Sequence, residues 1–140
     1  MGSGSVASRT ILLVDDDAVL CEMYRVKFEQ AGFRVTVSHD GAHALELLKS
    51  GLKPDLILLD LIMPGTDGYA FLRELKNKHL APCPIVVLTN QQEDVDKEEA
   101  FALGASHYIV KASATPKEIL DHIVEILQAH EDLAGHERSD

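Results

Sequence analysis

The hydrophobic positions of this chain form two kinds of pattern, short unbroken runs and stripes that repeat every three or four residues. Residues 11–14, 56–59 and 85–88 are apolar at every position. Such runs are typical of strands that are covered on both faces in a parallel sheet. Residues 33–37 alternate more, as an edge strand does, and residues 107–110 are a fifth candidate. The pattern therefore predicts five short strands.

The segments between these runs have helical spacing. The clearest apolar stripes are Leu20, Tyr24, Phe28 and Ala31, then Phe71, Leu72 and Leu75, and finally Ile119, Ile123, Ile126 and Leu127. Gly32 and Gly104 follow helical segments, where glycine commonly ends a helix. The last helix has a clear start, because Thr115 and Glu118 can form a capping box around Pro116.

Strands and helices alternate five times, which predicts an α/β fold, a single doubly wound (βα)5 sandwich around a five-stranded parallel sheet. The length of 140 residues suits one domain. We assign residues 10–129 to this domain. The Gly/Ser-rich residues 1–9 are expected to form a flexible linker. The apolar stripe ends after Leu127, so residues 130–140 are expected to form a polar C-terminal tail.

Composition narrows the function. A net charge of −10 argues against direct nucleic-acid binding, which needs clustered Lys and Arg. No apolar run approaches the roughly 18 residues of a membrane span, and no secretory signal is present. We therefore expect a cytoplasmic protein without membrane contact. Cys21 and Cys83 belong to no CxxC pattern, so free thiols are expected rather than a zinc site or a disulfide.

Polar residues stand where four of the five predicted strands end. Asp15, Asp16 and Asp17 follow the first strand, and Asp60 follows the third. In the same way, the fourth strand leads into Thr89 and the fifth into Lys111. Ligands of open α/β sheets bind outside the carboxyl ends of the strands. These side chains are therefore expected to meet in one crevice.

Carboxylates in such a crevice call for a cation. Two of them about 4 Å apart repel by about 4 kcal/mol at an effective dielectric constant of about 20. An oxygen-only ligand set favours Mg²⁺, Ca²⁺ or Mn²⁺, and Mg²⁺ usually keeps positions for phosphate oxygens. Lys111 and Thr89 would then contact a phosphoryl group, and Asp60 would be the nucleophile that forms an acyl phosphate.

The segments ILLVDDD, LLDLIMPGTDG, VVLTN and GASHYIVKA, in this order, resemble the response-regulator receiver domains of two-component signalling. The resemblance covers residues 10–129 and implies the strand order 2-1-3-4-5. It implies a phosphorelay signalling module rather than an enzyme. A sensor histidine kinase or phosphotransfer protein would donate the phosphoryl group to Asp60. The response would appear on the surface of the fourth helix, fifth strand and fifth helix, about residues 95–127. An output protein or domain outside this chain would bind this changed surface. Phosphorylation is also expected to allow a homodimer.

The resemblance also assigns individual roles. It implies a part in the transfer for Asp60, Thr89 and Lys111. It implies Mg²⁺ ligands, with Mn²⁺ as an alternative, in Asp15, Asp16, Asp60 and the backbone carbonyl of Ile62. Thr89 and Tyr108 match the switch residues of the family. Ile62 and Gln91 hold the positions that modulate dephosphorylation, and an apolar Ile62 predicts slow loss of phosphate because it cannot orient water.

Two positions depart from the family pattern. Ala112 follows Lys111, where the family usually has a proline in a cis peptide. A cis bond before a non-proline residue costs about 2.5–4 kcal/mol, so either a trans bond with an altered loop or a costly cis bond is expected. Asn90 follows Thr89, where small residues are commoner, and the sequence does not indicate its effect.

Other interpretations remain open. Asp15, Asp16 and Asp17 could simply cap the first helix, and Lys111 could be a solvated loop residue. His39 lies four residues before His43, but a metal site there would lack carboxylates. A pseudo-receiver would use the same fold without phosphate. A flavodoxin-type carrier lacks its Ser/Thr/Gly-rich loop here, and a haloacid-dehalogenase-type phosphatase lacks a second acid two residues after the nucleophile.

Overall fold

The structure of the chain is a computed structural model that describes residues 8–138. The expected linker therefore lies largely outside the described residues. The elements, in chain order, are β1 (Thr10–Val14), α1 (Ala18–Gln30), β2 (Arg34–Ser38), α2 (Gly41–Lys49), β3 (Leu56–Leu59), β4 (Ile62–Met63), β5 (Thr66–Asp67), α3 (Gly68–Asn77), β6 (Ile85–Thr89), α4 (Asp94–Ala102), β7 (His107–Val110) and α5 (Pro116–Arg138), with a short 3₁₀ helix at Lys111–Ser113 between the last two.

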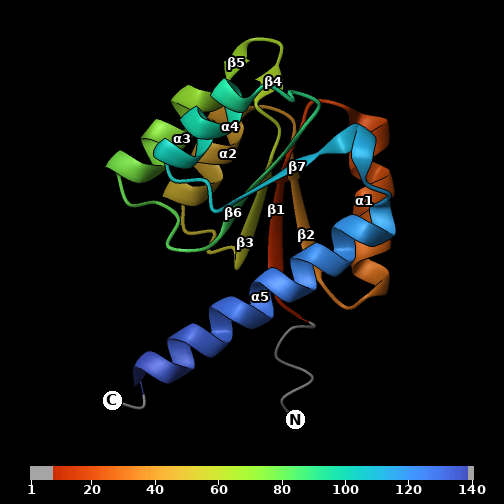
Figure 1. Cartoon of the computed structure of the whole chain (residues 1–140), viewed down its shortest axis with the longest axis vertical. Coiled ribbons are helices and arrows are strands. Elements are labelled where there is room, and N and C mark those ends of the chain that lie inside the picture. Colours follow the sequence, from red (N-terminus) through yellow and green to blue (C-terminus); the bar gives the residue numbers. More distant parts are fainter. Residues whose placement is uncertain (1–7, 139–140) are drawn as a thin grey trace.

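The main sheet has five parallel strands in the order β2-β1-β3-β6-β7. Counted by themselves in chain order, these strands are arranged 2-1-3-4-5, so the predicted fold and strand order are confirmed. The sequence did not predict the small antiparallel hairpin of β4 and β5, which follows β3. The hairpin stands at the carboxyl edge of the sheet, at the top of Figure 1.

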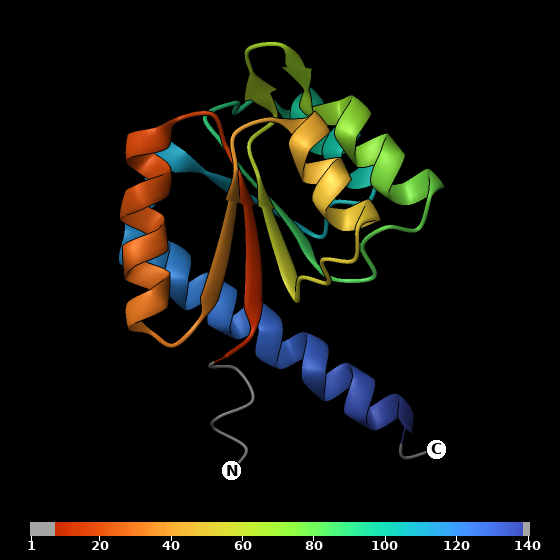
Figure 2. The same ribbon diagram turned by 180° about the vertical axis from the view of Figure 1, so that it is seen from behind.

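Helices cover both faces of the sheet. Helices α2, α3 and α4 lie on one side and α1 and α5 on the other, as the two opposite views show (Figures 1 and 2). In β1, Leu12 and Val14 pack with the first group, whereas Ile11 and Leu13 pack with the second. This two-sided burial explains the unbroken apolar runs. Complete burial of one such side chain contributes about 1.5–3 kcal/mol.

The helix ends agree with the sequence at several points. Gly32 and Gly104 have φ angles of 101° and 110°, a region that glycine enters without steric cost. Glu118 N–H donates to Thr115 Oγ1 at 3.1 Å, and Thr115 N–H donates to Glu118 Oε1 at 2.8 Å. The predicted capping box at the start of α5 is therefore confirmed.

The predicted end of the last helix is wrong. A polar tail was expected from residue 130, yet α5 continues to Arg138. Once a helix is nucleated, residues of good helix propensity such as Gln, Ala and Glu extend it without an apolar stripe. Within residues 8–138, none of the helices combines the length and the apolar character that crossing a bilayer requires.

Candidate functional site

Three aspartates form a cluster at the carboxyl edge of the sheet. Asp15 comes directly after β1 and Asp60 directly after β3, and these two strands are neighbours. One carboxylate oxygen from each of Asp15, Asp16 and Asp60 lies within 4.8 Å of the others. Asp15 and Asp60 are buried, whereas Asp16 is exposed. The expected convergence of the first and third strand ends is therefore present.

Lys111 reaches this cluster from the end of β7. Its Nζ lies 2.6 Å from Asp15 Oδ2 and 2.8 Å from Asp60 Oδ2. Burial alone would lower the pKa of Lys111, but the hydrogen bonds and charges of Asp15 and Asp60 outweigh it and raise that pKa. Burial also raises the pKa of Asp15, and Lys111 opposes this only in part. The ammonium group therefore stays charged and partly neutralises a buried acidic pair.

Backbone amides hold the other carboxylate oxygens. Asp17 N–H donates to Asp15 Oδ1 at 3.0 Å, and Ile62 N–H donates to Asp60 Oδ1 at 3.1 Å. The Asp17 side chain has a different task, because it accepts the Leu20 N–H at 3.0 Å and caps α1. Of the three aspartates after β1, Asp15 and Asp16 belong to the cluster, whereas Asp17 is the N-cap of α1.

The donor set suits a hard divalent cation. All the clustered atoms are carboxylate oxygens, which Mg²⁺, Mn²⁺ and Ca²⁺ prefer over softer metals. The formal charge of three carboxylates and one ammonium is negative, so a divalent ion would neutralise the cluster. These residues therefore fit a bound Mg²⁺.

A pocket of about 390 Å³ opens beside the cluster. It is lined by Asp60, Ile62, Thr89, Asn90 and Gln91. Thr89 is the last residue of β6 and is buried, whereas the Ile62 side chain is 55% exposed. The ends of β3 and β6 thus supply a carboxylate and a hydroxyl to one small space, and the Lys111 ammonium group contacts that same carboxylate.

Tyr108 connects the loop after β6 to α4. Its hydroxyl donates to the backbone carbonyl of Gln91 at 2.9 Å, and its ring centroid lies 6.3 Å from that of Phe101. Lys97 Nζ lies 5.9 Å from the same ring. Burial, with smaller contributions from nearby acids, raises the pKa of Tyr108 to about 12. Tyr108 therefore contacts both the loop that lines the pocket and helix α4.

The turn after Lys111 takes the first of the two expected forms, a trans bond. All the peptide bonds of residues 8–138 are trans, including Lys111–Ala112. The Ala112 N–H donates to Asn90 Oδ1 at 3.0 Å. The sequence did not indicate this contact, although a non-proline residue at 112 and an amide side chain at 90 were both visible as departures.

The two histidines near the cluster have structural partners. His39 Nδ1 lies 3.0 Å from the Asp15 carbonyl, so this nitrogen must carry the proton. Ser38 Oγ donates to the Asp40 carbonyl at 2.8 Å, which leaves it to accept from His43 Nδ1 at 3.0 Å. Neither histidine belongs to the carboxylate cluster, so a separate histidine metal site gains no support.

The cysteines are free thiols, as expected. Burial raises the pKa of both Cys21 and Cys83 to about 12, so neither is a reactive thiolate at neutral pH.

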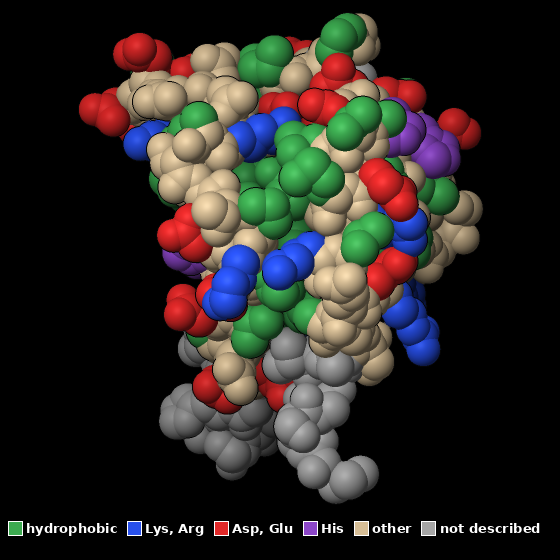
Figure 3. Space-filling model, turned by 90° about the vertical axis from the view of Figure 1, so that its right-hand side faces the viewer, with side chains coloured by type: hydrophobic (Ala, Val, Ile, Leu, Met, Phe, Trp, Pro, Cys, Tyr) green, Lys and Arg blue, Asp and Glu red, His purple; other side chains and the backbone are tan. Residues whose placement is uncertain are grey.

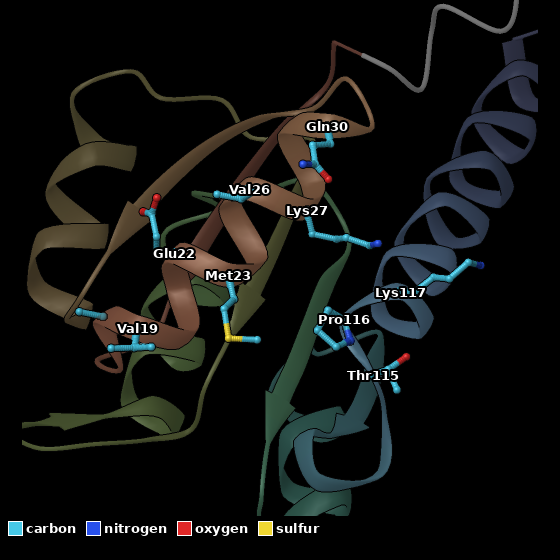
Figure 4. Close-up of a pocket in the computed structure, with 10 residues that line it drawn as sticks. Val19, Glu22, Met23, Val26, Lys27, Gln30, Thr115, Pro116 and Lys117 are labelled. Atoms are coloured by element: carbon cyan, nitrogen blue, oxygen red, sulfur yellow. The ribbon is translucent and has the colours of Figure 1, made fainter.

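An apolar groove lies on the α1 side of the molecule. Val19, Met23 and Val26 form an exposed stripe on α1, with 76%, 50% and 41% of their surface accessible. Figure 3 shows hydrophobic side chains gathered on this side, with lysine and arginine side chains around them. The groove measures about 880 Å³, and Pro116 and Lys117 form its opposite side (Figure 4). The sequence analysis missed it, although the i, i+4, i+7 spacing was readable.

The fold and site together define a doubly wound α/β module with an acidic crevice where the strand order switches. The sequence of residues 11–124 matches the family of the response regulator receiver domain. The chain belongs to this family. Receiver domains are signalling modules of two-component systems that bind Mg²⁺ through an acidic cluster, and they act with histidine kinases or phosphotransfer proteins and with output domains.

Solved structures of receiver domains are similar over nearly their whole length. The receiver domain of the Francisella response regulator 1452 is 26% identical with a TM-score of 0.79, and the match covers 88% of this chain and 99% of that one. The BeF3-activated N-terminal receiver domain of Klebsiella pneumoniae RstA is 31% identical with a TM-score of 0.75, covering 84% and 97%. Chemotaxis protein CheY4 of Vibrio cholerae is 27% identical with a TM-score of 0.78, covering 86% and 99%.

Proposed function

We propose that this receiver domain accepts a phosphoryl group on Asp60 from a phosphohistidine donor in a Mg²⁺-dependent reaction. The observation that carries the proposal is the contact of the Lys111 ammonium group with both Asp15 and Asp60 inside one acidic cluster. A pseudo-receiver has no need to keep a buried lysine between two carboxylates, because such burial is costly unless the charges are used or fully paired.

The transfer is a displacement at phosphorus. A carboxylate oxygen of Asp60 attacks the phosphorus atom, the bond from phosphorus to the histidine nitrogen breaks, and its electron pair stays on an imidazole ring whose other nitrogen already carries a proton. The product is an acyl phosphate on Asp60 and a neutral histidine on the donor. Lys111 is placed to hold one phosphoryl oxygen, and the Thr89 hydroxyl to donate to another. Catalysis of this kind consists mainly of positioning and charge neutralisation.

Asp15, Asp16 and Asp60 would hold the Mg²⁺, together with the backbone carbonyl of Ile62, and Mn²⁺ would serve in its place. The bound ion would neutralise charge that builds up on the phosphoryl oxygens. Proximity of the three carboxylates supports this ligand set.

The phosphorylated domain would signal through the surface made by α4, β7 and α5. Thr89 ends the strand beside the pocket, and Tyr108 donates to the carbonyl of Gln91 in the following loop. A shift of Thr89 toward a phosphoryl group would move this loop and release or tighten Tyr108. Residues 95–127, which include Lys97 and Phe101 beside that ring, would then present a different surface to the output protein or domain.

The apolar groove supports a helical donor. A stripe of exposed apolar residues at helical spacing is the surface that an amphipathic partner helix covers. The groove borders the site, since α1 begins just after the aspartate cluster and Pro116 lies shortly after Lys111. Met23→Glu is expected to slow phosphoryl transfer from a histidine-phosphorylated protein while leaving labelling by acetyl phosphate unchanged. Equal slowing in both assays would argue against docking here.

The experiment that tests the function uses acetyl phosphate with Mg²⁺ and maps the adduct by mass spectrometry. We expect one phosphoryl adduct on Asp60 that requires the metal and disappears in Asp60→Asn. The exposed Asp121→Asn serves as the matched control and should be labelled normally. No adduct on the wild type would favour the pseudo-receiver, and rapid multiple turnover of a phosphoester would favour a phosphatase.

Some assignments stay predictions. These are the domain limits at residues 10 and 129, the control of phosphate lifetime by Ile62 and Gln91, the cytoplasmic location, and the homodimer formed on phosphorylation.

A further inference from the structure

The loop after β6 and the turn after β7 are joined by one side chain. The paired register of these strands ends at Thr89 and Val110. Asn90 and Lys111 follow, and the chain then turns away into the 3₁₀ helix. Across this opening, Asn90 Oδ1 accepts the Ala112 N–H at 3.0 Å. The contact joins residues that directly follow Thr89 and Lys111, two groups expected to touch the phosphoryl group.

The turn that carries Lys111 has few other restraints. The first N–H groups of a helix have no partner within the helix. The 3₁₀ helix has no cap from the side chain of Val110, and its own closing bond, from Ala114 N–H to the Lys111 carbonyl, is long at 3.4 Å. Asn90 therefore supplies a short hydrogen bond to a turn that otherwise has weak ones.

The contact also fixes the Asn90 amide. A backbone N–H can only donate, so the oxygen of the amide must face Ala112. Asn90 is itself part of the pocket lining with Asp60 and Thr89. One side chain thus lines the pocket and binds the residue next to Lys111, whose ammonium group contacts Asp60 of the same pocket.

We infer that Asn90 is a positioning residue, which acts through Ala112 to hold the Lys111 ammonium where the phosphoryl oxygens bind. The inference rests on the proposed function. It gives one explanation for two departures from the family pattern, Asn90 and Ala112, because a proline at position 112 would have no N–H to donate to Asn90. The two positions should then depend on each other.

The test compares affinity for beryllofluoride, a phosphoryl analogue, with affinity for Mg²⁺ alone. Asn90→Ala is expected to weaken beryllofluoride binding in saturating Mg²⁺ by about twofold to tenfold, the range of a single hydrogen bond. Mg²⁺ affinity should stay within about twofold, since the aspartate cluster is untouched. Asn90→Asp keeps the acceptor and should recover most of the loss. Gln92→Ala removes an exposed amide from the same loop and is the matched control.

A double-mutant cycle tests the dependence. Ala112→Pro should weaken beryllofluoride binding about as much as Asn90→Ala does. The double variant should bind beryllofluoride no more weakly than either single variant. Additive losses, or unchanged beryllofluoride affinity in Asn90→Ala, would overturn the inference and leave the proposed function intact. If the wild type neither binds beryllofluoride nor is labelled by acetyl phosphate, the proposed function itself is wrong, and the inference about Asn90 falls with it. Hydrogen exchange of the Ala112 amide reports the hydrogen bond directly. This amide should exchange slowly in the wild type and quickly in Asn90→Ala. Fast exchange in the wild type would contradict the hydrogen bond.

Discussion

Replacing Lys111 by methionine should affect two ligands of the site in opposite directions. The methionine keeps much of the length of the side chain but removes the ammonium group that lies 2.6 Å from Asp15 and 2.8 Å from Asp60. Without metal, the buried carboxylates lose their counter-charge. With metal, the cation loses a competitor for the same oxygens. We therefore expect lower stability without Mg²⁺, tighter Mg²⁺ binding, and weaker binding of beryllofluoride.

The magnitudes follow from the distances. Carboxylate oxygens no more than 4.8 Å apart repel by at least about 3.5 kcal/mol at an effective dielectric constant of about 20. Protonation of Asp15, whose pKa burial already raises, would relieve part of this, so we expect the free energy of unfolding to fall by about 2–3 kcal/mol. That corresponds to a melting temperature lower by roughly 5–10 °C. Removal of a positive charge that contacts two of the carboxylates proposed to hold the ion should raise Mg²⁺ affinity at least about tenfold after screening.

Thermal unfolding in EDTA and in MgCl₂ measures the first effect, and titration calorimetry with each ligand measures the others. Lys117→Met is the matched control, because that lysine is 71% exposed and pairs with Asp121 on the helix surface. Unchanged stability in EDTA together with unchanged or weaker Mg²⁺ binding would refute the view that the Lys111 ammonium group neutralises the acidic pair.

Three further predictions concern the residues around the site. Gly68→Ala would place a methyl carbon 2.5 Å from Leu61 Cα and 2.6 Å from its carbonyl oxygen, so the free energy of unfolding in urea should fall by about 1–3 kcal/mol. Gly65→Ala, whose added carbon meets nothing within 4 Å, should carry only the backbone strain of its φ of 73° and lose less stability in the same urea titration, and an equal loss would contradict the steric explanation. Because burial raises the pKa of Asp15 above the ordinary value of 3.8, Mg²⁺ affinity measured by calorimetry should begin to fall at a higher pH than a freely exposed aspartate would produce. The folded state holds this proton more tightly than the unfolded state, so the metal-free domain should lose stability as pH rises through the raised pKa of Asp15. An Mg²⁺ affinity that does not change with pH would contradict the raised pKa. Ile62→Asn should shorten the lifetime of the phosphorylated domain, measured by loss of label, by up to about tenfold if the amide orients a water.

Local pattern was enough for the architecture. The three unbroken runs predicted strands covered on both faces, and each of them lies in a strand of the main sheet. The alternating residues 33–37 and the candidate at residues 107–110 predicted the other two strands, β2 and β7. The polar residues at the strand ends predicted a common crevice, because parallel strands place their carboxyl ends on one edge. Asp15, Asp60 and Lys111 meet there. The strand order itself came from the family resemblance rather than from the pattern.

Other features depend on contacts that no local pattern contains. Asn90 and Ala112 are 22 positions apart, and their hydrogen bond exists only because β6 and β7 are paired in one register. The extension of α5 to Arg138 was missed for a different reason, since the periodicity ended where helix propensity and an established helix were sufficient to continue it.

The sequence by itself determined which segments form the five strands of the main sheet and the helices between them, which of their faces are buried, and which polar residues stand at the strand ends. It could do so because each of these depends on the spacing of neighbours along one element. Only the tertiary structure decided that one ammonium group bridges two carboxylates, one of them 51 positions away in the chain. The distances between groups on different strands depend on register, twist and burial of the whole sheet, and so do the pKa values that follow from those distances.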